Sequence, residues 1–97
     1  EQAVPIGLIV NELVTNSAKH AFDGGGGSIQ IELLAGQGPG LACLIVKDNG
    51  KGFDKSKTSG SGLKLVRALA DQIRGRIEHE SSHRGTTTRL TFAPRAA

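Results

Sequence analysis

The sequence predicts a single α+β domain, a two-layer α/β sandwich whose helices cover one face of a mixed, largely antiparallel sheet. Three observations lead to this prediction. Helix-like and strand-like segments follow the order helix, strand, strand, helix, strand, strand. A short loop joins the first two strands, which must therefore be antiparallel, and this excludes a doubly wound parallel sheet. The 97 residues contain no internal repeat, so we expect residues 1–97 to form one domain.

The first element is a predicted helix over residues 4–22. At about 100° per residue, its apolar side chains share one broad face. That face comprises Ile6, Ile9, Val10, Leu13, Val14, Ser17 and Ala21. Val4-Pro5 suits the entry, because proline is tolerated in a first helical turn, and Asp23 with the glycine run 24–27 ends the helix.

The opposite face of this helix carries Glu12, Asn16, Lys19 and His20. A solvated face usually carries Lys and Glu rather than Asn, which is a poorer helix former. Glu12 can act as a base or orient water, Asn16 can supply a neutral oxygen to a magnesium ion that shares the oxygens of a triphosphate, and Lys19 can reach a phosphate. An exposed face with an incidental Asn is the alternative for this helix considered alone.

Two pairs of strands follow from the side-chain pattern. Residues 28–33 alternate apolar and polar side chains, as a half-buried strand does, and a glycine-rich loop leads to a more continuously apolar strand over 41–47. The latter is predicted to be central. Residues 76–82 and 86–92 form two further alternating strands. His79 and His83 lack a Cys or His partner at metal-ligand spacing, so both are predicted to lie on the surface.

Two glycine motifs lie between the central strand and a second predicted helix over residues 63–74, which Gly75 ends. The first runs from Asp48 to Phe53 and the second from Gly60 to Leu63. The Asp48 carboxylate can accept from an exocyclic amine, and glycines let the backbone approach a ligand. A helix N-terminus favours phosphate, because its N–H groups are unpaired. Each motif alone is weak, but together with the polar face of the first helix, at the other end of the chain, they indicate a nucleotide pocket.

Composition excludes several other classes of protein. The net charge is +3, with three Phe and no Trp or Tyr, so a nucleic-acid partner, which usually needs stacking aromatics, is not expected. No apolar run approaches the roughly 20 residues of a membrane span, and no segment resembles a signal peptide. The single Cys43 excludes an internal disulfide and indicates a cytoplasmic setting, without membrane contact. The chain lacks Met and begins at Glu1, so we expect a domain of a larger protein.

Four motifs in this order resemble the GHKL ATPase superfamily, which includes gyrase B, heat-shock chaperone ATPases, histidine kinases and MutL. They are Asn11–His20, similar to the N box; Asp48–Gly52, similar to the G1 box; Gly60–Leu63, similar to the G2 box; and Gly85-Thr86 before the last strand. The resemblance covers nearly the whole chain and implies the Bergerat-type ATP-binding fold. The N box looks closest to that of bacterial sensor histidine kinases of the branch that reads NELVTNA-x-KHAF.

The resemblance implies ATP and Mg²⁺ as cofactors. Asp48 would accept from the adenine amine, with Thr86 helping through water. Asn16 would coordinate magnesium, and Glu12 beside it would be the catalytic base or orient water. The other residues that the resemblance assigns to the nucleotide are Lys19 and His20 near the phosphates, Gly60, Gly62 and Leu63 around them, and Gly50 and Gly52 in the adenine-side turn.

The resemblance further implies a catalytic domain that supplies the γ-phosphoryl group of ATP for autophosphorylation of a histidine in two-component signalling. The chain has no dimerising hairpin with a phosphoacceptor histidine, and its lid between the glycine motifs is short. The expected partners are therefore a separate dimerisation domain of the same protein and, downstream, a response regulator. Two alternatives stay open: a serine kinase of the anti-sigma-factor type, and a degenerate nucleotide-sensing module.

Overall fold

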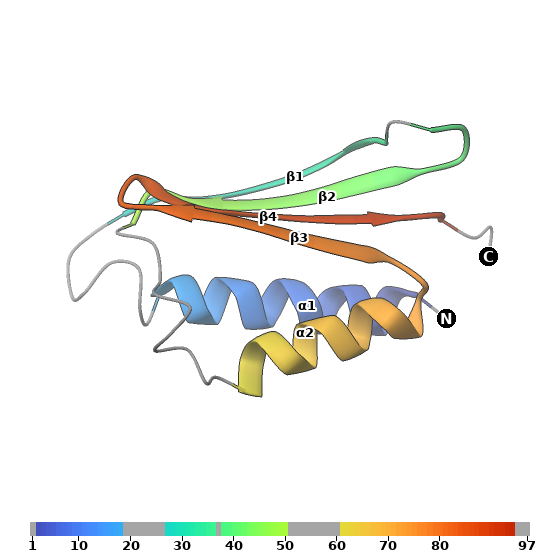
Figure 1. Ribbon diagram of the computed structural model, residues 1–97, viewed down its shortest axis with the longest axis horizontal. Helices are drawn as coiled ribbons and strands as arrows, with labels where there is room; N and C mark the ends of the chain where they lie inside the picture. Colours follow the sequence, from blue (N-terminus) through green and yellow to red (C-terminus); the bar gives the residue numbers. More distant parts are fainter. Residues whose placement is uncertain (1, 19–26, 37, 51–60, 95–97) are drawn as a thin grey trace.

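Two helices lie against one face of a four-stranded sheet (Figure 1). The computed structural model describes residues 2–18, 27–36, 38–50 and 61–94, without the side chains of 61–63. Its elements are α1 (Ala3–Asn16), β1 (Ile29–Ala35), β2 (Ala42–Asp48), α2 (Ser61–Gln72), β3 (Arg76–Ser82) and β4 (Gly85–Phe92). The predicted two-layer sandwich and the predicted order of elements are confirmed.

The strands lie in the order β1-β2-β4-β3, so β4 inserts between β2 and β3. All three pairings are antiparallel, and the parallel component of a mixed sheet is not found among the described strands. β2 has a neighbour on each side, as predicted for the more continuously apolar strand. Because β2 and β4 are central, their ends are held on both sides by backbone hydrogen bonds.

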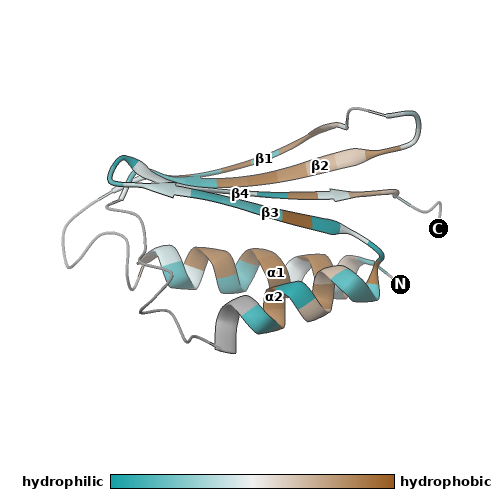
Figure 2. Cartoon of the chain, in the orientation of Figure 1, coloured by the Kyte–Doolittle hydropathy of each residue, from teal (hydrophilic) through white to brown (hydrophobic). Residues whose placement is uncertain are grey.

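The apolar side chains of α1 and of the sheet meet in one core between the layers. Ile9 and Leu13 of α1 are buried, and Ile6 and Val10 pack beside them, which confirms the predicted face. The buried hydrophobic residues are Ile9, Leu13, Leu44, Val46, Val66, Leu69, Ala70, Ile73, Leu90 and Phe92. Figure 2 shows the hydrophobic colour concentrated on β2 and on the two helices. No described helix is long and apolar enough to span a membrane.

The structure describes only part of the helix predicted over residues 4–22. The regular α-helix ends at Asn16, and the backbone N–H of Ser17 donates to the carbonyl oxygens of both Leu13 and Val14. Residues 19–22 of the predicted helix lie outside the described part of the chain. Residues 17 and 18 continue the chain as a wider π-helical turn, so Ser17 lies where the helix leaves its regular geometry.

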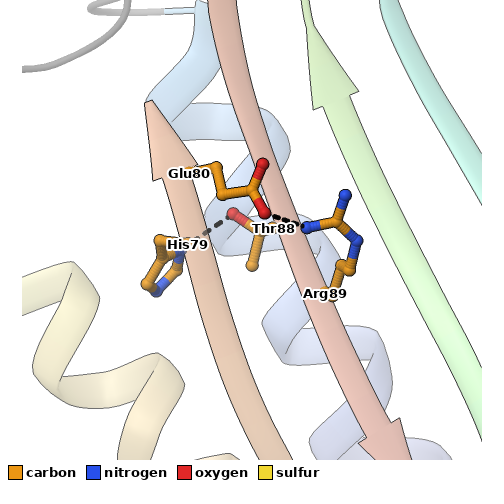
Figure 3. Close-up of polar contacts among 4 residues, drawn as sticks. All are labelled: His79, Glu80, Thr88 and Arg89. Atoms are coloured by element: carbon orange, nitrogen blue, oxygen red, sulfur yellow. Dashed lines mark hydrogen bonds and ion pairs between the residues drawn. The ribbon is translucent and has the colours of Figure 1, made fainter. Parts of the chain in front are cut away.

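The two faces of the sheet carry different polar contacts (Figure 3). On the outer face, Nη1 of Arg89 lies 2.8 Å from Oε1 of Glu80, an exposed pair of the kind that contributes at most about 1 kcal/mol. On the helix-facing side, Nδ1 of His79 lies 2.9 Å from the hydroxyl of the buried Thr88. The prediction that His79 is a surface residue is therefore wrong, because alternation along β3 turns this ring inward, whereas His83 is exposed.

Arg74 and Gly75 have different roles in the turn that follows α2. The residue with a left-handed backbone is Arg74, with φ 56°, whereas Gly75 is not among the residues with positive φ. Gly75 donates its N–H to the carbonyl of Ala70 at 2.8 Å. A Cβ at position 75 would lie 2.8 Å from Cδ1 of Leu90 and 3.2 Å from the carbonyl oxygen of Thr91. Gly75 is thus required for close packing against β4.

We expect Gly75→Ala and Arg74→Gly to change stability in opposite directions. The alanine would overpack the contact with Leu90 and lower the free energy of unfolding by about 1–3 kcal/mol. The glycine would relieve the strain of the left-handed backbone and raise the free energy of unfolding by about 0.5–1 kcal/mol. Urea unfolding followed by circular dichroism measures both. A change of the same sign in the two variants would contradict this account of the turn.

Candidate functional site

The ends of several elements meet at one end of the molecule. The C-terminal end of α1, the end of β2 and the start of β4 lie at the left in Figure 1, and the first turn of α2 is the end of that helix nearer to this side. The antiparallel register explains part of this arrangement, because Asp48, the last residue of β2, pairs with Ile29 of β1 and with Thr86 of β4. The motifs of α1, β2 and β4 that the sequence analysis identified are therefore brought together.

The Asp48 carboxylate is the centre of this cluster. Its Oδ1 accepts hydrogen bonds from the backbone N–H groups of Gly50, at 3.0 Å, and Thr86, at 3.2 Å. Its Oδ2 accepts from the Ser17 hydroxyl at 2.7 Å. A carboxylate offers about four lone-pair sites, of which these three donors use three. The acceptor capacity that remains after these contacts is on Oδ2.

The turn that follows β2 is tied to the start of β1. The side-chain oxygen of Asn49 accepts from the backbone N–H of Ser28 at 2.8 Å, and the Asn49 N–H donates to the Ser28 carbonyl at 3.3 Å. Gly50 beside it is buried. These contacts hold the backbone that presents Asp48 at a defined position, independently of any ligand.

Gly85 makes the approach of β4 to Asp48 possible. Its φ is 137°, a conformation that side chains rarely adopt. A Cβ at this position would collide with the carbonyl oxygen of Asp48 and would lie 3.0 Å from its carbonyl carbon and 3.1 Å from Cα of Asn49. The glycine lets the next residue, Thr86, bring its N–H to the carboxylate.

The structure brings together part of the predicted site. Asp48, Gly50 and Thr86 form one hydrogen-bonded cluster. Glu12 and Asn16 are half-buried and one turn apart on the last turns of α1, at the same end of the molecule. Predicted residues for which the structure gives no contacts are Gly62 and Leu63, which lie in the first turn of α2, and Lys19, His20, Gly52 and Gly60, which lie outside the described residues.

The described side chains form no metal site of their own. Within residues 2–18, 27–36, 38–50 and 61–94, no three side chains of His, Cys, Asp or Glu lie together in a way that could hold a metal ion. A divalent ion beside Asn16 would therefore need most of its ligands from elsewhere, such as phosphate oxygens and water, as Mg²⁺ commonly does.

Ser17 is the residue of this cluster that sequence reasoning missed. Its position assigned it to the apolar face of α1, and it does point toward the sheet. The signal was a hydroxyl within an otherwise apolar stripe, because a buried polar group needs a hydrogen-bond partner. That partner is the carboxylate of Asp48, 31 residues away in the sequence.

Residues 1–96 match the family described as histidine kinase-, DNA gyrase B- and HSP90-like ATPase. The chain belongs to this family. The resemblance stated from the motifs is thereby confirmed at the level of the superfamily, and membership implies an ATP-binding domain. No match was found among curated protein sequences.

Similar solved structures are those of histidine kinases. The histidine kinase domain of the Erythrobacter litoralis EL346 blue-light-activated histidine kinase is 25% identical, with a TM-score of 0.83 over 95% of this chain and 47% of that one. A second structure of that kinase is 26% identical, with a TM-score of 0.84 over 96% of this chain and 30% of that one.

The catalytic domain of histidine kinase ThkA shares the fold. It is 21% identical, with a TM-score of 0.73 over 93% of this chain and 65% of that one. The chain thus spans half or less of the two Erythrobacter structures and about two thirds of the ThkA domain. These neighbours confirm the α/β fold of histidine kinase catalytic domains.

We expect Gly85→Ala to lower the free energy of unfolding by about 3 kcal/mol or more, because backbone overlap with Asp48 adds to strain at positive φ. Gly40→Ala is the matched control: Gly40 also has positive φ, 73°, but a Cβ there would meet no atom within 4 Å. The control should cost about 1–2 kcal/mol. Equal losses in the two variants, measured by urea unfolding, would show that the contact with Asp48 is unimportant.

Proposed function

We propose that this domain binds ATP with Mg²⁺ and supplies the γ-phosphoryl group for autophosphorylation of a histidine on a separate dimerisation domain of the same protein. The observation that carries the proposal is the Asp48 carboxylate, which three donors hold in place while Oδ2 keeps acceptor capacity. Membership of the ATPase family and similarity to histidine kinases support it.

Adenine is the base that this acceptor suits. An ionised carboxylate only accepts hydrogen bonds, so it pairs with the exocyclic amine of adenine. A 6-oxo purine would instead place an acceptor opposite an acceptor. Thr86, whose N–H already contacts Asp48, would assist through water, and Gly50 and Gly52 would shape the turn beside the base.

The phosphates would extend from Asp48 toward the start of α2. This 12-residue helix begins at Ser61, its N-terminal end is the one nearer to the end of β2, and the unpaired N–H groups of a first turn favour anions. In this proposal the backbone at Gly60, Gly62 and Leu63 surrounds the phosphates. Lys19 and His20 approach them with their side chains.

The last turns of α1 would serve the reacting end of the nucleotide. Asn16 is suited to hold Mg²⁺ through its neutral side-chain oxygen, with phosphate oxygens as further ligands. When bound, the ion would neutralise charge on the transferred phosphoryl group. Glu12, one turn earlier, would take the proton of the attacking group or orient it.

The domain would act together with a second domain and a downstream protein. The phosphoacceptor histidine is placed on another domain, because none of His20, His79 and His83 occurs in a dimerising helical hairpin. The phosphoryl group would then pass to a response regulator in two-component signalling. Both partners and the single Cys43 suit a cytoplasmic location.

The first test is calorimetric titration with ADP and with an ATP analogue plus magnesium. We expect Asp48→Asn to weaken binding by about 1–3 kcal/mol, because a carboxamide cannot accept from all of its present donors and from the amine. Asp71→Asn on the exposed surface of α2 is the matched control and should bind as the wild type does. If the folded wild type binds no nucleotide, or if Asp48→Asn binds equally well, the proposed site is wrong.

A second test addresses the chemistry in the longer protein that contains the dimerisation domain. We expect Glu12→Gln to retain nucleotide binding within about threefold and to lower the rate of phosphohistidine formation about 10²-fold or more, as for loss of an acid–base group. Glu78→Gln, on an exposed part of β3, is the control. Acid-labile phosphate from labelled ATP is the readout. Acid-stable phosphoserine on a partner protein would indicate the serine-kinase alternative instead.

A further inference from the structure

We infer that Ser17 is a positioning residue that sets the specificity of this site for a 6-amino purine. This inference rests on the proposed function, because it assigns the base of the nucleotide to Asp48. Ser17 would not itself contact the ligand in this role. Its hydroxyl donates to Oδ2 of Asp48, the carboxylate oxygen that can accept a further hydrogen bond. This contact would orient Oδ2 so that its free lone pair faces the exocyclic amine of the purine.

The geometry of the contact supports this role. Ser17 Oγ lies 2.7 Å from Oδ2 of Asp48, which is within the range of a charge-assisted hydrogen bond. Both residues are half-buried, so water competes less for the contact than at an exposed site. Oδ1 is engaged by two backbone donors, so it cannot substitute for Oδ2 without losing one of them.

The position of Ser17 in the chain makes the contact unusual. A serine within a helix commonly bonds back to a carbonyl of the preceding turn. Here the carbonyls of Leu13 and Val14 are used by the backbone N–H of Ser17 itself, and the hydroxyl reaches across to β2. The helix therefore offers the hydroxyl of Ser17 to a different element.

The contact also links the end of α1, which carries Glu12 and Asn16, to the carboxylate at the end of β2. Ser17 follows Asn16 directly and lies one turn and a half beyond Glu12 on α1. A hydrogen bond from this residue to Asp48 fixes the distance between the helix end that carries Asn16 and the carboxylate that would select the base. Both specificity and alignment of the nucleotide would depend on it.

The test compares two nucleotides that differ at the 6-position of the purine, ADP and inosine diphosphate. Loss of the hydroxyl in Ser17→Ala should lower the affinity for ADP about fivefold to twentyfold, because Oδ2 is no longer oriented. The affinity for inosine diphosphate, which lacks the amine, should change less than about twofold. The ratio of the affinity for ADP to the affinity for inosine diphosphate should therefore fall by nearly the same factor as the affinity for ADP.

Three further variants make the test specific. Ser17→Thr keeps the hydroxyl and should restore ADP binding to within about twofold of the wild type. Ser17→Cys keeps the volume with a weak donor, should bind ADP with intermediate affinity, and replaces Ser17→Ala if that variant does not fold. Thr87→Ala removes a hydroxyl from the outer face of β4 and should leave both affinities unchanged.

Each outcome decides the question. If ADP and inosine diphosphate lose affinity by the same factor, Ser17 is only structural and the inference is overturned. If the wild type binds ADP and Ser17→Ala binds it equally well, the inference alone fails. If the folded wild type binds neither nucleotide, the proposed function fails first and the inference fails with it.

Discussion

The arrangement of this domain depends on how one carboxylate is satisfied. Asp48 ends a central strand, and a charged group there is costly unless donors surround it. The donors come from three elements: the end of α1 through Ser17, the turn after β2 through Gly50, and the start of β4 through Thr86. This one group therefore joins the helix layer to the sheet at the polar end of a sandwich whose interior is packed with apolar side chains.

This arrangement has a consequence for ligand binding. The carboxylate is positioned by the protein's own hydrogen bonds, so little of its freedom remains to be lost when a ligand arrives. Gly85 contributes by its lack of a side chain, since only a glycine lets the β4 backbone come so close to Asp48. Rigid elements thus support the part of the site proposed for the base, as precise recognition requires.

Much of this structure could be predicted from local patterns. Apolar side chains at helical spacing identified the buried face of α1, and alternation identified four strands whose described ends lie within about two residues of the prediction. The order of the motifs indicated the superfamily, and Asp48, Gly50 and Thr86 do meet. One local prediction failed for a tertiary reason: His79 faces the helix layer beside Thr88. The turn after α2 also depends on tertiary packing, because Gly75 lies close to Leu90 while Arg74 adopts the left-handed backbone.

By itself, the sequence determined the elements, the faces that they bury and the residue types available for a nucleotide, because these depend on side-chain periodicity and on local backbone preferences. Only the tertiary structure decided the strand order β1-β2-β4-β3 and the partners of Asp48. A period of two tells which face of a strand is buried but not which strand lies beside it. Ser17 illustrates the difference. Its place on α1 could be predicted from the sequence, but its proposed role depends on Asp48, whose Oδ2 comes within 2.7 Å of the Ser17 hydroxyl only in the folded chain.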